Sequence, residues 1–201
     1  MTCGIVLAAG ESRRMGRQKV LLDYGGRSVI RHIVGQLQAS AIERVYVVTG
    51  ADSERVAGEL RETGVGILHN AGWKEGMLSS VRCGLRGVEG GCDSVMVLLG
   101  DQPTVTSGLI DRIVKAYDES KKGILVPVYE GRRGHPIVFS TRYREKVLSG
   151  YDDVGLRGLM EEYAADVFEF EVTDANVCRD MDDPADYEYY LRMLRDKGGG
   201  E

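Results

Sequence analysis

A basic loop that contains two glycines lies between two apolar runs and constrains this chain most. The loop covers residues 7–19, which read LAAGESRRMGRQK, and it follows an apolar run at residues 3–7 that is typical of a buried strand. Glycine lets a backbone turn sharply and lets a ligand approach the main chain closely. The N–H groups of such a turn form a concavity that binds anions, and three arginines and one lysine surround it. The loop therefore predicts a polyphosphate site, with a basic surface turn as the alternative.

The loop departs from the two commonest nucleotide-binding patterns. A P-loop ends in Gly-Lys-Ser/Thr, whereas residues 16–20 read GRQKV. The Rossmann fingerprint G-x-G-x-x-G is also absent from the loop. A nucleotide bound here would be held by a different motif.

Length and charge narrow the class of protein. A chain of 201 residues predicts one domain, here residues 1–197, followed by a disordered glycine-rich tail at residues 198–201. The net charge of -5 argues against a nucleic-acid partner, since nucleic-acid binders usually carry a basic face. No apolar stretch is long enough to cross a bilayer, and the N-terminus shows no signal-peptide pattern. We expect a cytoplasmic protein with neither a membrane nor a nucleic acid as partner.

The four cysteines are scattered along the chain and form no Cys-x-x-Cys pair. This spacing is typical of reduced, mostly structural thiols in a cytoplasmic protein. Three histidines offer few partners for a zinc site or a cysteine nucleophile. We therefore expect reduced thiols at Cys3, Cys83, Cys92 and Cys178.

Apolar runs that read as strands alternate with segments of helical periodicity. Such alternation predicts an α/β protein with a three-layer, doubly wound, mostly parallel sheet. The expected strands cover residues 3–8, 44–49, 66–69, 94–99, 123–128, 135–139 and 167–172. Helices are expected after the capping residue Ser28 and at residues 53–62, 106–118, 142–148, 156–163 and 184–197. The strand at residues 135–139 follows a predicted hairpin turn and is expected to be the one antiparallel strand.

Asp101 follows the clearest central strand of the chain, residues 94–99. Ligands of open α/β sheets bind outside the carboxyl ends of the strands, so Asp101 is expected at the same edge as the basic loop. A carboxylate beside a polyphosphate raises the local negative charge unless a cation lies between them. Asp101 is therefore a candidate metal ligand, and the alternative is an ordinary turn aspartate before Pro103.

Other polar side chains have two interpretations each. Ser80 lies in the first turn of a helix predicted after a loop, where a hydroxyl either caps the helix or meets a polar ligand. Trp73 either packs or stacks on a ligand. Arg133 at the hairpin tip either faces solvent or reaches an acceptor phosphate, and His135 either positions substrate or ends the turn.

Carboxylates gather again before the last predicted helix. Asp183 precedes Pro184, a favoured first residue of a helix, so Asp183 is explained by capping. Capping does not explain Asp180 and Asp182. In an extended segment alternate side chains point to the same face, so these two carboxylates would lie together. They are further candidates for a metal site.

The basic loop resembles the signature L-A-[AG]-G-x-S-x-R-M-G-x-x-K of nucleotidyltransferases that act on phosphorylated sugars, alcohols or the molybdenum cofactor. The positions that agree are Ala8, Gly10, Ser12, Arg14, Met15, Gly16 and Lys19. Further blocks follow in order: NAGW at 70–73, GMLSSV at 76–81, LGDQP at 99–103, GHPIVF at 134–139 and DMDDP at 180–184. Together they resemble the molybdenum cofactor cytidylyltransferase family over nearly the whole chain, to about Leu194.

The resemblance implies a fold like that of nucleotide-diphospho-sugar transferases and a role for each matched residue. The implied nucleotide-binding residues are Ala8, Ala9, Gly10, Ser12, Arg14, Gly16, Lys19 and Ser80. The implied catalytic residues are Arg14 and Lys19, which would hold the triphosphate, and Asp101. Asp101 would hold Mg²⁺ together with Asp182 as first choice and Asp180 as second. Arg133, Gly134 and His135 would lie beside the acceptor.

The resemblance also implies a reaction: CTP and a phosphate-bearing pterin, molybdopterin or the molybdenum cofactor, would give a dinucleotide and pyrophosphate. A phosphate monoester has a second pKa near 6, so the attacking oxygen is already ionised at neutral pH and needs no general base. This agrees with the absence of an obvious Ser/His/Asp or Cys/His arrangement. A molybdoenzyme or its chaperone is a further partner for the product.

Four other functions stay open from the sequence. A guanylyltransferase would use GTP with the same cofactor, and a related transferase would use another phosphorylated acceptor. An NADPH-dependent oxidoreductase is a rival from another class, because one fold supports different chemistries. The last is a binding or chaperone module that carries the cofactor without turnover.

Overall fold

The computed structural model describes residues 1–88 and 90–198. The strands are β1 (Thr2–Ala8), β2 (Arg44–Thr49), β3 (Gly66–His69), β4 (Ser94–Leu99), β5 (Ile124–Tyr129), β6 (Arg132–Arg133), β7 (Ile137–Ser140) and β8 (Val167–Glu171). The α-helices are α1 (Val29–Gln38), α2 (Ser53–Leu60), α3 (Met77–Gly87), α4 (Ser107–Ser120), α5 (Arg144–Ser149), α6 (Leu156–Glu162) and α7 (Pro184–Gly198). The short 3-10 helices are η1 (Arg13–Met15), η2 (Lys19–Leu21), η3 (Trp73–Glu75), η4 (Thr141–Tyr143), η5 (Ala164–Asp166) and η6 (Ala175–Cys178).

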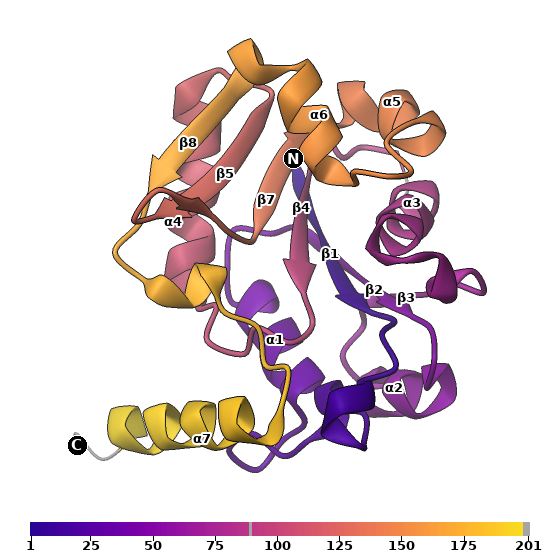
Figure 1. The fold of residues 1–201 in the computed structure, drawn as a ribbon, viewed down its shortest axis with the longest axis vertical. Helices are drawn as coiled ribbons and strands as arrows, with labels where there is room; N and C mark the ends of the chain where they lie inside the picture. Colours follow the sequence, from indigo (N-terminus) through magenta and orange to yellow (C-terminus); the bar gives the residue numbers. More distant parts are fainter. Residues whose placement is uncertain (89, 199–201) are drawn as a thin grey trace.

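The described strands form one mixed sheet (Figure 1). Its order is β3-β2-β1-β4-β7-β5-β6, and β8 pairs with β5. Strands β1 to β4 are mutually parallel where they pair, and β8 is parallel to β5. Strand β7 runs antiparallel to both neighbours, β4 and β5. The predicted mostly parallel sheet with an antiparallel strand near residues 135–139 is confirmed, and the two-residue β6 adds a short antiparallel hairpin to β5.

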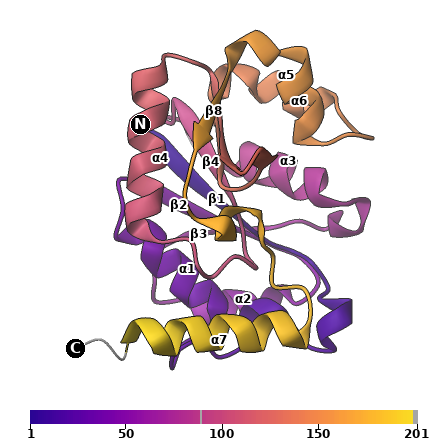
Figure 2. The same ribbon diagram turned by 60° about the vertical axis from the view of Figure 1, so that its left-hand side comes forward.

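Helices cover both faces of the sheet and make three layers (Figure 2). One hydrophobic core joins the sheet to α1, α2 and α4, and the second joins it to α3, α5 and α6. Every residue of β4 is buried, as expected for a central strand covered on both faces. The loops that follow β1 and β4 lie at the sheet edge formed by the carboxyl ends of these strands.

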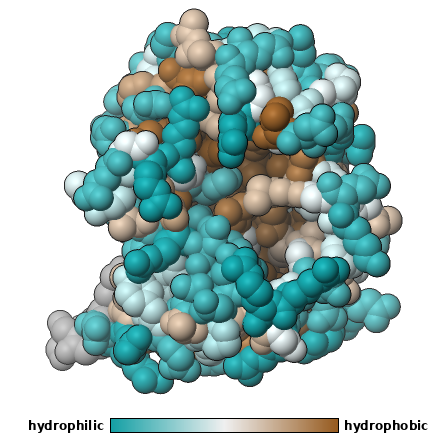
Figure 3. All heavy atoms as spheres, in the orientation of Figure 1, coloured by the Kyte–Doolittle hydropathy of each residue, from teal (hydrophilic) through white to brown (hydrophobic). Residues whose placement is uncertain are grey.

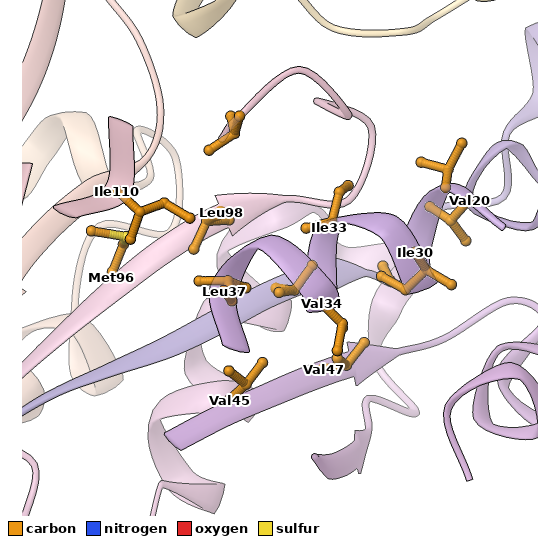
Figure 4. Close-up of a cluster of buried hydrophobic side chains, with 14 of the residues drawn as sticks. Val20, Ile30, Ile33, Val34, Leu37, Val45, Val47, Met96, Leu98 and Ile110 are labelled. Carbon is orange, nitrogen blue, oxygen red and sulfur yellow. The ribbon is translucent and has the colours of Figure 1, made fainter. Parts of the chain in front are cut away.

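Helix α1 shows how the sequence pattern builds a layer. Figure 4 shows its apolar side chains beside those of β2 and β4: Ile30, Ile33, Val34, Leu37, Val45, Val47, Met96 and Leu98. Burial of one such side chain stabilises the fold by about 1.5–3 kcal/mol. The side chain of Ser28 accepts a hydrogen bond from the backbone N–H of Arg31, which confirms the predicted cap.

The prediction of four reduced cysteines is wrong. Cys3 and Cys92 form a disulfide, while Cys83 and Cys178 are free. Strand β1 lies beside β4, with Thr2 in register with Ser94, so two segments that are 89 residues apart in the sequence meet at one end of the sheet. Linear spacing does not show this proximity.

The last helix begins and is capped as the sequence indicates. The carboxylate of Asp183 accepts hydrogen bonds from the backbone N–H groups of Ala185 and Asp186, at 2.8 and 3.0 Å. Farther along α7, the hydroxyl of Tyr187 donates to the backbone oxygen of Asp23 at 2.6 Å. Gly198 belongs to α7 and not to the predicted tail, and residues 199–201 lie outside the described part of the chain.

Helices long and apolar enough to span a membrane are absent from residues 1–88 and 90–198.

Candidate functional site

Internal hydrogen bonds fix the shape of the basic loop. The hydroxyl of Ser12 donates to Oε1 of Gln18 at 2.6 Å and accepts from the backbone N–H of Lys19 at 3.0 Å. Nε2 of Gln18 donates in turn to the backbone oxygen of Gly10 at 2.9 Å. Ser12 therefore braces the loop from inside, and Gln18, which no sequence pattern had singled out, is its partner.

The two loop glycines serve different needs. Gly16 has a φ of 65°, a left-handed conformation that favours glycine. A Cβ at Gly10 would meet no protein atom within 4 Å, so the packing of the described residues does not require glycine there. Open space over the backbone at Gly10 is what close approach of a ligand needs.

A charged cluster joins three distant parts of the chain at the end of β4. Nζ of Lys19 donates to Oδ2 of Asp101 and, at 3.1 Å, to Oδ1 of Asp182. Nη2 of Arg14 donates to Oδ2 of Asp182 at 2.8 Å. The side chains of Lys19 and Asp101 are only 15% and 17% exposed, so water screens this pair weakly. The structure thus brings together the residues that the sequence predicted as catalytic.

Burial and charge act in opposite directions on these groups. Burial lowers the pKa of Lys19, but attraction to Asp101 and Asp182 outweighs it and the net change is upward. Burial raises the pKa of Asp101, and Lys19 only partly offsets that effect. For Asp182, hydrogen bonds from Lys19 and Arg14 overcome burial, and the pKa is lowered. Lys19 therefore keeps its charge at neutral pH.

One oxygen of Asp101 suits a metal ion. Its Oδ1 is buried and has no hydrogen-bond partner in the described structure. The described residues contain no group of three or more His, Cys, Asp or Glu side chains placed to hold a metal. Mg²⁺ commonly binds one or two protein carboxylates and takes its other oxygens from substrate phosphates and water. The donor set therefore fits a cation that arrives with a polyphosphate.

The two late aspartates lie in the same cleft but have different partners. Asp182 is bound to Lys19 and Arg14. Oδ1 of Asp180 instead accepts a hydrogen bond from Nε2 of Gln102 at 2.9 Å. Gln102 is a residue whose role sequence reasoning missed, although it directly follows Asp101.

A cleft of about 630 Å³ lies over the loop and the charged cluster. Its walls include Ala8, Ala9, Gly10, Ser12, Lys19, Trp73, Ser80, Asp101, Asp180 and Asp182. The side chain of Ser80 is 4% exposed, and its hydroxyl accepts from Nδ2 of Asn70 at 3.1 Å. The hydroxyl of Ser79 lies within donor distance of the backbone oxygens of Gly76 and Gly72, and no described side chain caps the start of α3. Ser80 therefore lines the cleft, with its hydroxyl oxygen held by Asn70.

A second cavity of about 480 Å³ lies between α3, α6 and the segment before β7. Its lining includes Arg133, Gly134 and His135, the predicted acceptor residues. Figure 3 shows a hollow with a hydrophobic floor on this face of the molecule. Met77 lines both cavities, so the two meet at the start of α3. The wall from α6 and the loop before it, which carries Arg157, was not predicted.

The three predicted acceptor residues differ in their surroundings. Arg133 forms an ion pair with Glu169 at 2.7 Å and is partly exposed. Burial lowers the pKa of His135 to about 4, with Asp101 acting against it, so the imidazole is neutral at neutral pH. Gly134 is required by packing, because a Cβ there would lie 2.2 Å from the backbone oxygen of Val177.

Comparison with known proteins agrees with this architecture. The chain is 28% identical over 188 residues to the molybdenum cofactor cytidylyltransferase of Escherichia coli, covering 91% of this chain and 92% of the relative. It is 30% identical over 146 residues to a probable molybdenum cofactor guanylyltransferase of Pyrococcus horikoshii, covering 70% of each chain.

Solved structures of Rv0371c from Mycobacterium tuberculosis share the fold. One crystal structure aligns with a TM-score of 0.83 at 27% identity, over 95% of this chain and 97% of that one. A complex of the same protein with manganese aligns with a TM-score of 0.79 at 25% identity, over 95% and 98%.

The family match covers most of the loop, sheet and helix arrangement described above. Residues 4–167 match the family described as the MobA-like NTP transferase domain. The matched segment contains the basic loop, Ser80, Asp101 and the residues before β7, but ends before Asp180 and Asp182. The chain belongs to the family of MobA-like NTP transferases, which are nucleotidyltransferases.

Proposed function

We propose that the protein transfers CMP from CTP to the phosphate of molybdopterin or the molybdenum cofactor and releases pyrophosphate. The observation that carries this proposal is the position of the Lys19, Asp101 and Asp182 cluster. It lies in a cleft large enough for a nucleotide, beside a second cavity that meets the first at Met77. Two adjoining cavities suit a reaction that joins two bound molecules.

In the proposed step an oxygen of the acceptor phosphate attacks the α-phosphorus of CTP in line. A bond forms between that oxygen and the α-phosphorus, and the bond from the α-phosphorus to the oxygen that bridges to the β-phosphate breaks. The electron pair leaves with pyrophosphate. The acceptor phosphate is already mostly dianionic above its second pKa near 6, so the protein does not need to remove a proton.

Lys19 and Arg14 are assigned to the triphosphate. Both cations lie on the loop and contact the carboxylates at the end of β4 and in the C-terminal segment. Their charge would offset the negative charge that grows on the leaving pyrophosphate. Gly10 and Gly16 keep the loop backbone accessible to the phosphates, and Ser12 keeps the loop in shape.

Asp101 would hold Mg²⁺ together with Asp182 or Asp180. The buried, unpartnered Oδ1 of Asp101 supports this assignment, as does a related structure that is a complex with manganese. When bound, the cation would supply positive charge beside the α-phosphate and the acceptor phosphate.

The second cavity is proposed to receive the acceptor. Its apolar walls suit a flat ring system, and Arg133, Gly134 and the neutral His135 line it. Because Arg133 is paired with Glu169, its share of acceptor binding requires exchange of that partner. A molybdoenzyme or its chaperone as recipient of the product, and a cytoplasmic location, are parts of this proposal.

CTP is favoured over GTP for two reasons. The cytidylyltransferase relative aligns over 91% of this chain, whereas the guanylyltransferase relative aligns over 70%. Ala9 also lines the cleft, where an alanine in place of glycine would restrict the space and the backbone beside the base. A guanylyltransferase of the same cofactor is the second candidate, because its relative also aligns through the loop and shares the family.

Pyrophosphate release from each of the four nucleoside triphosphates, with and without molybdopterin, tests the proposal. We expect release to require molybdopterin and to favour CTP over GTP by at least about tenfold in kcat/KM. A preference for GTP would support the guanylyltransferase instead. Equal pyrophosphate release with and without molybdopterin would contradict transfer to the phosphate of that acceptor. A change in NADPH fluorescence when NADPH is mixed with the protein would favour the oxidoreductase instead.

A further inference from the structure

The side chain of Gln102 links the end of β4 to the C-terminal acidic segment. It is only 2% exposed. Its Nε2 donates to Oδ1 of Asp180 at 2.9 Å and to the backbone oxygen of Val177 at 3.4 Å. One buried amide therefore contacts a segment that is more than seventy residues farther along the chain.

Backbone contacts beside Gln102 bring the same segments together. The N–H of Met181 donates to the backbone oxygen of Asp101 at 2.9 Å, and the N–H of His135 donates to the oxygen of Val177 at 2.8 Å. These bonds set the path of the backbone, but they do not orient the side chain of Asp180. The amide of Gln102 is the contact that does so.

Asp180 is exposed in the cleft, where an unrestrained side chain has several rotamers available. It also lies close enough to Asp101 for its charge to raise the pKa of that carboxyl. Repulsion between the two carboxylates favours rotamers that move Asp180 away from Asp101. A neutral N–H donor opposes this movement without adding a charge that would compete with a cation.

The other end of the amide supports a specific role. Oε1 of Gln102 is buried and has no partner in the described residues. A buried amide oxygen without a hydrogen bond destabilises a fold, so an apolar side chain of the same size would serve packing better. The benefit of an amide at this position lies at its nitrogen, which holds Asp180.

We infer that Gln102 is a positioning residue that fixes the carboxylate of Asp180 beside Asp101 and so completes the cation site. The inference rests on the metal assignment within the proposed function. Gln102 itself is assigned no contact with the nucleotide or the cation. Oδ2 of Asp180 is the oxygen left to face a cation, while Asp182 keeps Lys19 and Arg14 as its partners.

The experiment measures Mn²⁺ affinity by electron paramagnetic resonance of the free ion, with CTP present and no acceptor. Gln102→Leu keeps the side-chain volume and removes the donor. We expect it to weaken Mn²⁺ binding by about 10-fold to 100-fold, the usual effect of losing a residue that orients a metal ligand. CTP affinity in EDTA should stay within about twofold of the wild type, because the nucleotide contacts are untouched.

A double-mutant cycle separates positioning from a general loss of structure. Asp180→Ala should weaken Mn²⁺ binding, and adding Gln102→Leu to it should cause no further loss, because Gln102 acts through Asp180. Thr104→Val is the matched control, since the hydroxyl of Thr104 is buried in the same loop and has no partner in the described residues. It should leave Mn²⁺ affinity unchanged. Gln102→Met serves as a second variant if the leucine variant does not fold.

Three results would overturn the inference: wild-type Mn²⁺ affinity in the folded leucine or methionine variant, full additivity with Asp180→Ala, or no Mn²⁺ binding by the wild type. A separate assay, pyrophosphate release from CTP in the presence of molybdopterin, tests the proposed function. If release fails while the Mn²⁺ pattern holds, the proposed reaction is wrong and the role of Gln102 stands.

Discussion

The basic loop and the acidic segment at residues 177–183 line one cleft, but they are held in place by opposite means. The loop is braced by contacts within itself, from Ser12 to Gln18 and from Gln18 to Gly10. The acidic segment is held by distant residues, through Gln102 and the backbone of His135. Local bracing makes the loop recognisable in the sequence, whereas the acidic segment depends on how the rest of the chain folds.

Asp101 lies where the two regions meet, so its loss should have the largest effect. Asp101→Ala is expected to abolish metal-dependent turnover, because it removes the buried oxygen assigned to the cation. The fold should survive, since Asp101 follows the end of β4 instead of lying within the core. Activity and thermal melting are measured on the same sample. Normal turnover in a folded variant would show that Asp101 is not a metal ligand.

Loss of the loop cation should have the next largest effect. Lys19→Ala should lower kcat by about 10²–10³-fold, the usual result of removing one group that stabilises charge in the transition state. The dissociation constant for CTP should change much less, if Lys19 acts mainly on the leaving pyrophosphate. Steady-state kinetics and equilibrium binding of CTP check this. A higher KM with an unchanged kcat would mean that Lys19 stabilises bound CTP and the transition state equally.

Alanine at a glycine of the loop, and at a glycine that packs against the acidic segment, should show how differently the two regions are held. Gly134→Ala should lower the free energy of unfolding by about 1–3 kcal/mol, because its Cβ would overlap the backbone oxygen of Val177. Gly10→Ala should change it by less than about 0.5 kcal/mol, since no protein atom lies within reach of that Cβ, yet CTP binding should weaken. Urea unfolding and CTP titration measure both. Equal loss of stability in the two variants would remove the distinction between the regions.

Base selectivity tests the loop alone. The wild type should prefer CTP over GTP by at least about tenfold in kcat/KM, equivalent to about 1.4 kcal/mol. Ala9 lines the cleft, and Ala9→Gly should relax this preference by removing a methyl group and freeing the backbone there. That methyl group also lies near Gly50, so the backbone at both positions should be checked by melting. An unchanged ratio in a folded Ala9→Gly variant would assign base choice to another wall.

The smallest expected effect concerns His135 and pH. Burial holds the pKa of His135 at about 4, so the imidazole does not titrate between pH 5.5 and 8. The rate should instead fall as the pH drops below about 6, because the acceptor phosphate gains a proton and becomes a weaker nucleophile. His135→Asn should leave the midpoint of this fall unchanged. A shifted midpoint would give His135 a proton-transfer role.

The sequence predicted the parts of the fold that depend on local pattern. The bounds of β2, β3 and β4 agree with the predicted strands, because apolar runs flanked by turns define them. The edge shared by the loop and Asp101 followed from the general geometry of parallel strands. The hydrogen bond from Lys19 to Asp101 shows that the loop and the end of β4 do meet at that edge.

Contacts between distant segments escaped prediction. The Cys3–Cys92 disulfide depends on the pairing of β1 with β4, which linear spacing does not reveal. Gly134 was predicted beside the acceptor, and the structure adds that the backbone of Val177 leaves no room for a side chain there. Gln102 stands in the LGDQP block, but that block does not show its contact with Asp180, which forms only when the C-terminal segment folds back.

Isotope tracing shows whether the protein transfers CMP to a phosphate acceptor. Molybdopterin is incubated with the protein and either [α-³²P]CTP or [γ-³²P]CTP, and the products are separated. We expect the α label to enter the acceptor product and the γ label to appear in pyrophosphate. Transfer of the γ label to the acceptor, or recovery of the α label only in free CMP, would contradict it.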